Sequence, residues 1–500
     1  MGILEQSFAL VFEPYTLLVI LLAACFGMFV GCIPGLSATM ATALLVPITF
    51  FMEPVPAIAV IVTATAMIIF AGDIPAALLR MPGTPASAAY VEETFRMTKS
   101  GRADDALGAA LVFSAIGGIF GSLVLMSVAP ALADIALRFS SDEYFWLVLL
   151  GLSCAVFVSP GSPAKGFISL LIGLFVATIG MGNPAGVPRF TFGNVELMGG
   201  ISLIPAMVGL FAVSEVLRSV VTKAPSLETA QNVKGGTFRT QWHNLKVYPV
   251  QAVRGSVVGT LIGALPGAGA DIAAWISYAI SKRCSKNREK FGTGHVEGVV
   301  EAGAANNSAV SGAWIPALVF GIPGDSITAI VIGVLYVKGL NPGPTIFIND
   351  PASVYAIFIT FIVANLIMLP LGWLAIRCAK PLLSVPRNVL MPTILIFCIV
   401  GAFAINNTVF GVSIMLVFGI LGFWMEENDI PVAPAILGLV LGPMLEQNFI
   451  STMIKHDGQI LGFFERPIAA GLGIVTIIVW FFPLILMALS RARGNESRTP

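Results

Sequence analysis

Two pairs of proline–glycine breaks recur in apolar surroundings in the two halves of the chain. Residues 74–83 read IPAALLRMPG, and residues 315–324 read IPALVFGIPG, 241 positions further on. The motif GCIPG at 31–35 returns as GALPG at 263–267, 232 positions further on. Proline ends helices because it lacks an N–H group, and glycine adopts conformations that other residues avoid. The pattern predicts two related halves, each with two interrupted helices.

The surroundings of these breaks indicate a membrane protein. Hydrophobic residues make up 57% of the chain and charged residues only 11%, whereas soluble domains carry about 25% charged residues. Apolar runs recur along the whole chain, and we expect about ten to thirteen crossings plus re-entrant pieces. The runs lack the alternation of transmembrane β-strands, so the predicted fold is an all-α polytopic membrane protein. Helices broken at matching places in two repeats are typical of transporters, whose substrate sites lie between the repeats.

The basic loops predict the orientation of the chain. Positively charged loops stay on the cytoplasmic side of bacterial-type membranes. The loops at 96–102 and 281–290 are basic, whereas their counterparts at 338–350 and 50–57 are not. Equivalent loops of different charge indicate inverted-topology repeats, which cross the membrane in opposite directions. We therefore expect a periplasmic N-terminus and a cytoplasmic C-terminus.

The same reasoning divides the chain into four segments. We expect an N-terminal membrane repeat at 1–221, a cytoplasmic linker at 222–246, a C-terminal membrane repeat at 247–490 and a cytoplasmic tail at 491–500. The linker has the polar, glycine-containing composition of a junction between halves. The N-terminus lacks the basic region of a cleaved signal, so the first apolar segment is expected to be a permanent span.

The breaks also predict a binding site. A break within the membrane frees backbone N–H and C=O groups, and it persists only where protein or a wet cavity covers it. The helix that begins after the break points its positive end toward this cavity, which suits a carboxylate without a buried basic side chain. Carbonyl groups at opposing helix ends suit Na⁺.

The candidate site residues lie at the breaks, just after them or in apolar helices beside them. The candidates for substrate binding are Pro34, Gly35, Ser37, Thr39, Arg80, Pro82, Gly83, Thr84, Ser87, Pro266, Gly267, Gly269, Asn306, Asn307, Pro323, Gly324 and Ser326. The candidates for ion coupling are Asp73, Asp271, Glu301 and Asp325. Charged residues in apolar sequence are costly and are usually functional.

Each candidate also has an ordinary structural explanation. Small hydroxyl residues serve as contacts between helices, and an aspartate after a break, such as Asp271 or Asp325, is a natural helix cap. Arg80 either clamps a substrate carboxylate or pairs with Asp73. The adjacent amides at 306–307 favour a polar site over a hydrogen bond between helices.

No catalytic group, metal site or cofactor is indicated. The six cysteines are scattered without CxxC spacing, and the three histidines are far apart. An intramembrane enzyme would need a constellation such as HExxH or GxGD, and neither occurs. A channel fits less well because paired broken helices enclose a site. We expect no nucleic-acid partner.

Four stretches carry a resemblance to a known family. They are GCIPGLSATMATALLVPITF at 31–50, MPGTPASAA at 81–89, RMTKSGRADDALG at 96–108 and the run at 263–329. In this order and spacing they resemble the large membrane subunit of the tripartite tricarboxylate transporters (TctA type), over nearly the whole chain. The resemblance implies ion-gradient-driven uptake of a di- or tricarboxylate-like substrate across a bacterial inner membrane, coupled to Na⁺ or H⁺. It also implies two partners, a small membrane subunit (TctB type) and a periplasmic substrate-binding protein (TctC type).

The chain departs from the family pattern near these motifs. The family commonly has a glutamate three residues before the Asn pair, where this chain has Gly303, and Glu301 lies about 200° around the helix from it. Arg80 and Asp325 stand where uncharged residues are expected, and Arg80 hints at a different or more strongly anchored anion. The alternative hypothesis is a standalone secondary carboxylate transporter or exporter without a binding protein.

Overall fold

The computed structural model describes residues 2–33, 36–158, 162–182, 186–221, 237–267, 269–379, 383 and 387–496. Helices form nearly all of the regular structure of these residues, as the apolar runs predict. The described strands, β1 (Gly180–Gly182) and β2 (Val187–Arg189), pair as one antiparallel hairpin with Met181 opposite Pro188.

The N-terminal half contains the helices up to α11. They are α1 (Ile3–Val11), α2 (Pro14–Gly31), α3 (Ala38–Thr49), α4 (Pro54–Ala71), α5 (Asp73–Leu79), the 3-10 helix η1 (Ser87–Tyr90), α6 (Val91–Lys99), α7 (Ala103–Ala136), α8 (Ser141–Val158), α9 (Pro163–Ala177), the 3-10 helix η2 (Val195–Gly199), α10 (Leu203–Val208), the π-helical turn η3 (Gly209–Val213) and α11 (Ser214–Val221).

The C-terminal half begins after the predicted linker, of which residues 222–236 lie outside the described part. Its elements are α12 (Thr237–Val247), α13 (Pro249–Gly263), α14 (Gly269–Cys284), η4 (Arg288–Lys290), α15 (Val296–Phe320), α16 (Ser326–Val337), α17 (Ile346–Asn349), α18 (Pro351–Arg377), α20 (Arg387–Asn406), α21 (Val409–Glu427), α22 (Val432–Lys455), η5 (Ile460–Phe464) and α23 (Pro467–Glu496).

Seven described helical segments are long and apolar enough to cross a membrane. They are Pro14–Gly31, Pro54–Leu79, Ala103–Ala136, Leu203–Val221, Pro351–Arg377, Val409–Glu427 and Val432–Lys455. Five shorter apolar helices accompany them, including α3 and α16 with 12 residues each. Twelve helical residues extend about 18 Å, roughly half of a bilayer core. The sequence predicts about ten to thirteen crossings, and the described residues contain seven helical segments of sufficient length. The short helices explain part of this difference, because one of them alone does not cross the bilayer core.

The order and packing of elements repeat around the first break of each half. α2, α3 and α4–α5 precede the second break of the N-terminal half, as α13, α14 and α15 do in the C-terminal half. α2 packs on α4 through Gly27 and Gly31, and α13 packs on α15 through the equivalent Gly259 and Gly263. A Cβ at any of these glycines would lie no more than 2.7 Å from the facing helix. The inverted orientation of the two halves stays a prediction.

The helices before the two second breaks end in the same way. α5 ends at Arg80 and α15 at Gly321, and both residues have left-handed backbone conformation, with φ of 57° and 68°. In each case the next residue donates its N–H to a proline carbonyl within the helix, at 3.3 Å to Pro75 and at 3.2 Å to Pro316. This is a common way to end a helix, because it satisfies a carbonyl that the helix leaves free.

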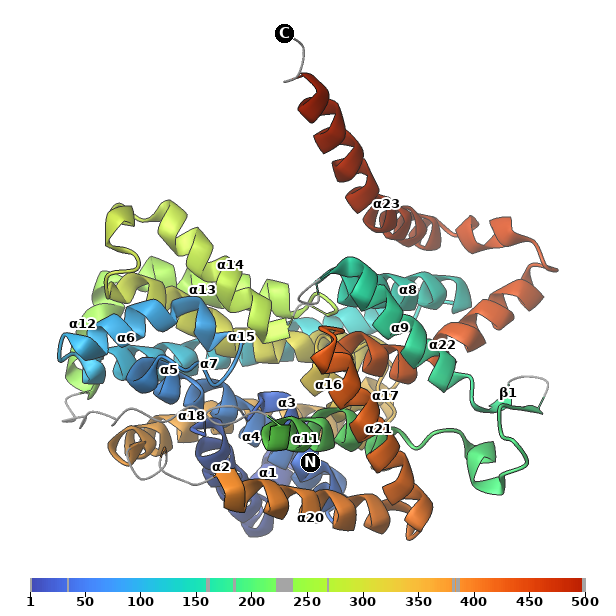
Figure 1. Cartoon of the computed structure of the whole chain (residues 1–500), viewed down its shortest axis with the longest axis horizontal. Helices are drawn as coiled ribbons and strands as arrows, with labels where there is room; N and C mark the ends of the chain where they lie inside the picture. The colour runs from blue at the N-terminus through green and yellow to red at the C-terminus, as the bar shows by residue number, and fades with distance from the viewer. Residues whose placement is uncertain are drawn as a thin grey trace.

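Helix α15 forms the centre of the fold. Every residue from Glu297 to Val319 is buried, and the helix packs on α7, α13 and α14. In Figure 1 these helices gather with α5, α6 and α12 at one end of the molecule, and α8, α9, α21 and α22 lie at the other. The region between these two ends contains the starts of α3, α14 and α16.

Candidate functional site

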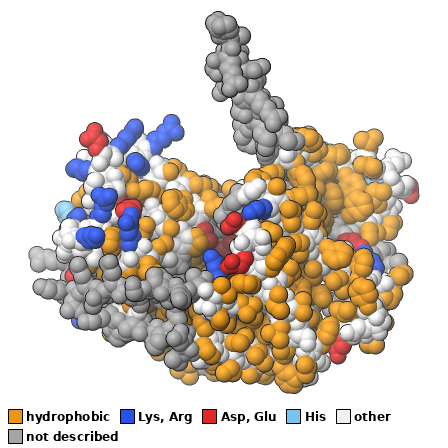
Figure 2. Space-filling view, in the orientation of Figure 1, with side chains coloured by type: hydrophobic (Ala, Val, Ile, Leu, Met, Phe, Trp, Pro, Cys, Tyr) orange, Lys and Arg blue, Asp and Glu red, His pale blue; other side chains and the backbone are white. Residues whose placement is uncertain are grey.

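A cavity of about 400 Å³ lies where the breaks of the two halves meet. The N-terminal half contributes residues 37–39 at the start of α3, Pro85, and one side chain each from α4 and α8. The C-terminal half contributes Gly267, the first turn of α14, residues 325–327 at the start of α16, and two side chains of α22. Figure 2 shows a hollow near the middle of this face with charged side chains around it, in a mostly hydrophobic surface.

Three helices begin at this cavity. Ser37 caps α3 by accepting the N–H of Met40 at 3.1 Å. Asp325 caps α16 by accepting the N–H of Thr328 at 2.7 Å, and the Thr328 hydroxyl in turn accepts the N–H of Asp325 at 2.8 Å. The first turn of α14 lines the cavity directly. Helix starts carry N–H groups without helical partners and the positive end of the helix dipole, so the cavity has an anion-attracting wall.

Two carboxylates face the same cavity. Asp271 is exposed to it and accepts the backbone N–H of Ala86, which lies in the opposite half. Asp325 lies against the start of α14, because a Cβ on Gly269 would be 2.7 Å from the Asp325 Cβ. Gly269 has φ +57°, a conformation that other residues rarely adopt. Among the described residues that line the cavity there is no basic side chain.

The remaining polar groups of the wall come from both halves. Thr39 and Ser326 contribute hydroxyl groups. Trp275 of α14 donates its ring N–H to the carbonyl of Pro85 at 3.1 Å, which ties the loop after the N-terminal break to the C-terminal half. This loop is fixed internally, since Thr84 and Ser87 each accept the backbone N–H of the other.

A separate group of polar residues lies in the core, outside the cavity lining. The hydroxyl of Tyr90 donates to Asp73 Oδ1 at 2.7 Å, and the amide of Asn306 donates to the Tyr90 oxygen at 3.4 Å. Asp73, Tyr90 and Asn306 are 0%, 1% and 0% exposed, respectively. The neighbouring Asn307 donates to Asn365 Oδ1 at 3.3 Å. Both predicted asparagines therefore bond residues of other elements.

Two further candidates are held in ion pairs. Arg80 pairs with Glu92 instead of Asp73, and both side chains are exposed. Glu301 is fully buried and forms a bidentate pair with Arg254 of α13, with contacts of 2.6 and 2.5 Å. Such a pair fixes α13 to α15, because a buried carboxylate requires a compensating charge.

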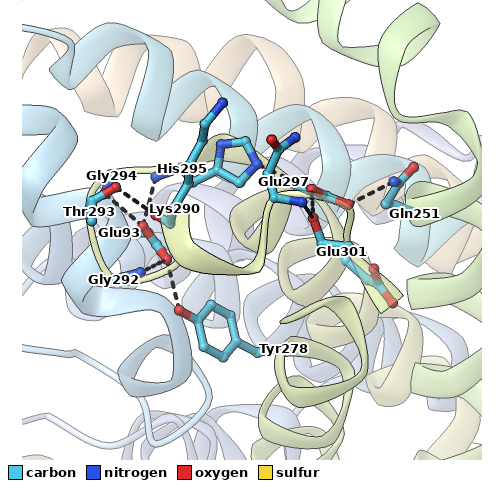
Figure 3. Close-up of polar contacts among 12 residues, drawn as sticks. Glu93, Gln251, Tyr278, Lys290, Gly292, Thr293, Gly294, His295, Glu297 and Glu301 are labelled. Carbon is cyan, nitrogen blue, oxygen red and sulfur yellow. Dashed lines mark hydrogen bonds and ion pairs between the residues drawn. The ribbon is translucent and has the colours of Figure 1, made fainter. Parts of the chain in front are cut away.

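The segment that connects α14 to α15 is anchored by a second buried carboxylate (Figure 3). Glu93 of α6 accepts the backbone N–H groups of Gly292, Gly294 and His295, the last two at 2.8 and 2.7 Å. The Tyr278 hydroxyl donates to the same carboxylate at 2.8 Å. α6 of the N-terminal half is thereby bound to residues 292–295, which follow the basic loop 281–290 of the C-terminal half. Arg102, at the end of the basic loop 96–102, also donates to the carbonyl of Gly294 at 3.0 Å. The common location of the two basic loops on one side of the membrane stays a prediction.

The structure brings some of the predicted site residues together at the cavity and places others elsewhere. Those in the cavity wall are Ser37, Thr39, Gly267, Gly269, Asp271, Asp325 and Ser326. Those outside the described lining are Asp73, Arg80, Pro82, Gly83, Thr84, Ser87, Pro266, Glu301, Asn306, Asn307, Pro323 and Gly324. Pro34 and Gly35 lie outside the described residues.

Two of the break glycines serve close packing. The ideal Cβ of Gly83 would lie 2.6 Å from Gly72 Cα, and that of Gly324 would lie 2.8 Å from Ala313 Cα. Gly72 and Ala313 are themselves equivalent positions, 241 residues apart. At these two breaks the glycine therefore lets the loop fold back onto its own helix.

The sequence analysis does not predict three residues of these polar groups, Tyr90, Trp275 and Arg254. Tyr90 and Trp275 look like ordinary aromatic core residues, and no sequence signal marks their hydrogen bonds. Arg254 had a signal, because it is a charged residue in an apolar run and such residues are usually functional or paired.

The helices of membrane-spanning length define a multi-pass membrane protein, and a cavity lies between its two halves. The family model of the tripartite tricarboxylate transporter TctA family matches residues 17–437. The chain belongs to this family, whose members are transporters and not enzymes and normally work in three-component systems.

Two curated proteins of Agrobacterium vitis are similar to the chain. An uncharacterized 52.8 kDa protein in the TAR-I ttuC' 3'region is 33% identical over 485 residues, which cover 96% of each chain. An uncharacterized protein in the TAR-II ttuC' 3'region is 37% identical over 217 residues, which cover 43% of this chain and 90% of that protein. No solved structure matches the chain.

Proposed function

We propose that the chain is an ion-gradient-driven importer of a small carboxylate, which binds in the cavity between the two halves. The observation that carries this proposal is the start of α3, α14 and α16 at one cavity. The positive ends of the three helix dipoles favour an anion there. In transporters, helix breaks at a repeat interface hold carboxylates in this way.

The charges of the cavity support a coupling cation that binds with the substrate. Asp271 and Asp325 both face the cavity, and its described lining holds no basic side chain. A carboxylate substrate next to two ionised aspartates would be repelled. Na⁺ or a proton at these aspartates removes the repulsion, so uptake of the anion requires the cation. This requirement is the physical basis of symport in the proposal.

The proposal extends to partners, location and orientation. Membership of a three-component family supports delivery by a periplasmic binding protein (TctC type) and assembly with a small membrane subunit (TctB type) in a bacterial inner membrane. The loops at 96–102 and 281–290 are expected in the cytoplasm. Lys338 donates to the carbonyls of Phe50 and Met52 at 2.7 and 2.5 Å, which supports one common side, the periplasmic one, for the other two loops.

The test is uptake by the complex reconstituted in proteoliposomes, with labelled mono-, di- and tricarboxylates and an imposed Na⁺ or H⁺ gradient. We expect saturable uptake of a carboxylate that requires one of the two gradients and the binding protein. Uptake at full rate by the chain alone would favour the standalone transporter. Absence of gradient-dependent uptake for every carboxylate would contradict the proposal.

A further inference from the structure

The buried group of Asp73, Tyr90 and Asn306 contains more acceptors than donors. Hydrogen bonds run from the Asn306 amide to the Tyr90 hydroxyl and from that hydroxyl to Asp73 Oδ1. Asp73 Oδ2 and Asn306 Oδ1 are buried and have no hydrogen-bond partner among the described residues. Each unpaired oxygen belongs to a planar group that also contacts Tyr90, so both lie within a few ångströms of its hydroxyl.

Unpaired buried oxygens are costly unless something positive binds them. A buried polar atom without a partner loses its hydration without compensation, and an isolated carboxylate loses far more. No ion pair of Asp73 occurs in the described part of the chain. The two neighbouring buried carboxylates on α6 and α15 differ, because Glu93 has four donors and Glu301 has Arg254.

The arrangement of these oxygens fits a cation better than a proton. A hard monovalent cation is satisfied by carboxylate, amide and backbone carbonyl oxygens together. A proton on Asp73 would serve only one further acceptor.

We propose that Asp73, Tyr90 and Asn306 form a binding site for Na⁺, separate from the cavity. Asp73 supplies the charge, and Asn306 Oδ1 and the Tyr90 hydroxyl oxygen are neutral ligands. The site joins α5 and η1 of the N-terminal half to α15 of the C-terminal half. This inference rests on the proposed function, because it adds a substrate-independent Na⁺ site to the cavity aspartates at which the coupling cation binds.

One short segment connects this site with the cavity. Pro85 lines the cavity, the N–H of Ala86 donates to Asp271, and Tyr90 lies four residues further on, at the end of η1. A displacement of this segment therefore changes both the cavity wall and the ligands of the buried cation. Na⁺ at Asp73 stabilises the position of η1 and, through it, the Ala86 contact in the cavity.

The experiment is ²²Na⁺ binding to the purified full-length chain in nanodiscs, without substrate, at constant ionic strength maintained with choline chloride. We expect saturable binding in the wild type. Asp73→Asn should weaken it about 10-fold or more, because a charged ligand is lost. Tyr90→Phe should weaken it by a smaller factor, because it removes one neutral ligand. Asp134→Asn, the same change at an exposed position of α7, should bind as the wild type does.

A second measurement distinguishes loss of the site from loss of the fold. Na⁺ should raise the thermal unfolding temperature of the wild type and of Asp134→Asn, since a ligand of the native state stabilises it. Asp73→Asn should unfold cooperatively without this Na⁺ dependence. Unchanged Na⁺ binding in Asp73→Asn, or a wild type that binds no Na⁺ and only takes up a proton, would overturn the inference. Carboxylate uptake without Na⁺ binding at Asp73 would overturn the inference and leave the proposed function intact. Na⁺ binding at Asp73 without any carboxylate uptake would contradict only the proposed function.

Discussion

The two second breaks, at residues 80–87 and 321–328, share a backbone but differ in side chains. Each follows a helix that ends in a left-handed residue, and each closes with a reciprocal pair of hydrogen bonds three residues apart. The pair is Thr84 with Ser87 in the first and Asp325 with Thr328 in the second. The residue whose side chain accepts the N–H three positions further on is therefore a buried threonine in one half and a carboxylate facing the cavity in the other.

The first breaks show the same asymmetry. Residues 37–39 and 269–271 occupy equivalent positions, 232 residues apart, and both line the cavity. Thr39 thus has Asp271 as its counterpart. At both pairs of equivalent positions the N-terminal half has a hydroxyl and the C-terminal half has a carboxylate. The comparison teaches that a shared scaffold supplies helix starts from both sides, while the negative charge of the cavity lining comes from one side.

The strongest test of the comparison is the sidedness of equivalent loops. Phe51 and Arg283 are both exposed and stand 232 residues apart. In a cysteine-free background we expect Phe51→Cys to react completely with an impermeant maleimide in whole cells, and Arg283→Cys to react only after the membrane is opened. A permeant maleimide should label both variants. Labelling of both from outside would contradict inverted repeats.

The next largest effect concerns the two equivalent helix pairs, α13 with α15 and α2 with α4. Arg254 of α13 pairs with buried Glu301, whereas the equivalent position on α2 is Leu22, which is 60% exposed. Arg254→Ala should lower the free energy of unfolding in detergent by about 3–5 kcal/mol, because it leaves a buried charge unpaired. Leu22→Ala should change it by about 0.5 kcal/mol or less.

The double variant Arg254→Met, Glu301→Met provides the control for this prediction. Replacement of both partners by apolar side chains should restore most of the stability that Arg254→Ala removes. If Arg254→Ala unfolds at the wild-type denaturant concentration, the ion pair has no structural role and the two helix pairs are energetically alike.

The sequence predicts the scaffold better than it predicts the partners. The paired offsets are visible in the sequence because proline and glycine mark helix ends locally, and the structure has the same helix ends at Arg80 and Gly321. The seven candidates at the cavity lie at a break or directly after one, but Thr84 and Ser87 have the same kind of position and lie outside the cavity lining. Their roles in binding stay predictions.

The partners depend on tertiary packing, which the sequence pattern does not contain. Asp73 meets Tyr90 only because the loop after Arg80 folds back onto Gly72, and Arg254 meets Glu301 only because glycines bring α13 close to α15. Periodicity gives the face of a helix but not the register between two helices. For the same reason, Arg80 pairs with Glu92 and not with Asp73, which was one of the two partners that the sequence analysis considers for Arg80.

A smaller effect compares the equivalent residues Asp325 and Thr84 at the second breaks. Asp325→Asn keeps a residue that caps helices well and removes the charge. We expect uptake to fall by about 10- to 150-fold, the range for a lost hydrogen bond to a charged group. Thr84→Ala should cost about 1 kcal/mol of stability and leave uptake by the folded protein near that of the wild type. Equal losses of uptake in both variants would show that the carboxylate has no special role.

The smallest effect compares the equivalent positions 37 and 269 at the first breaks. Gly269→Ala places a methyl group 2.7 Å from the Asp325 Cβ, at a φ of +57° that disfavours alanine. The resulting shift of Asp325 should raise the KM for the cation about fivefold, which corresponds to roughly 1 kcal/mol. Ser37→Ala removes the α3 cap and should lower stability by about 1 kcal/mol without changing the KM for the cation. KM values for cation and carboxylate in proteoliposomes measure both effects. A change in the cation KM that is as large in Ser37→Ala as in Gly269→Ala would mean that both halves contribute to the cation site of the cavity, and the asymmetry of the cavity would then have no functional consequence.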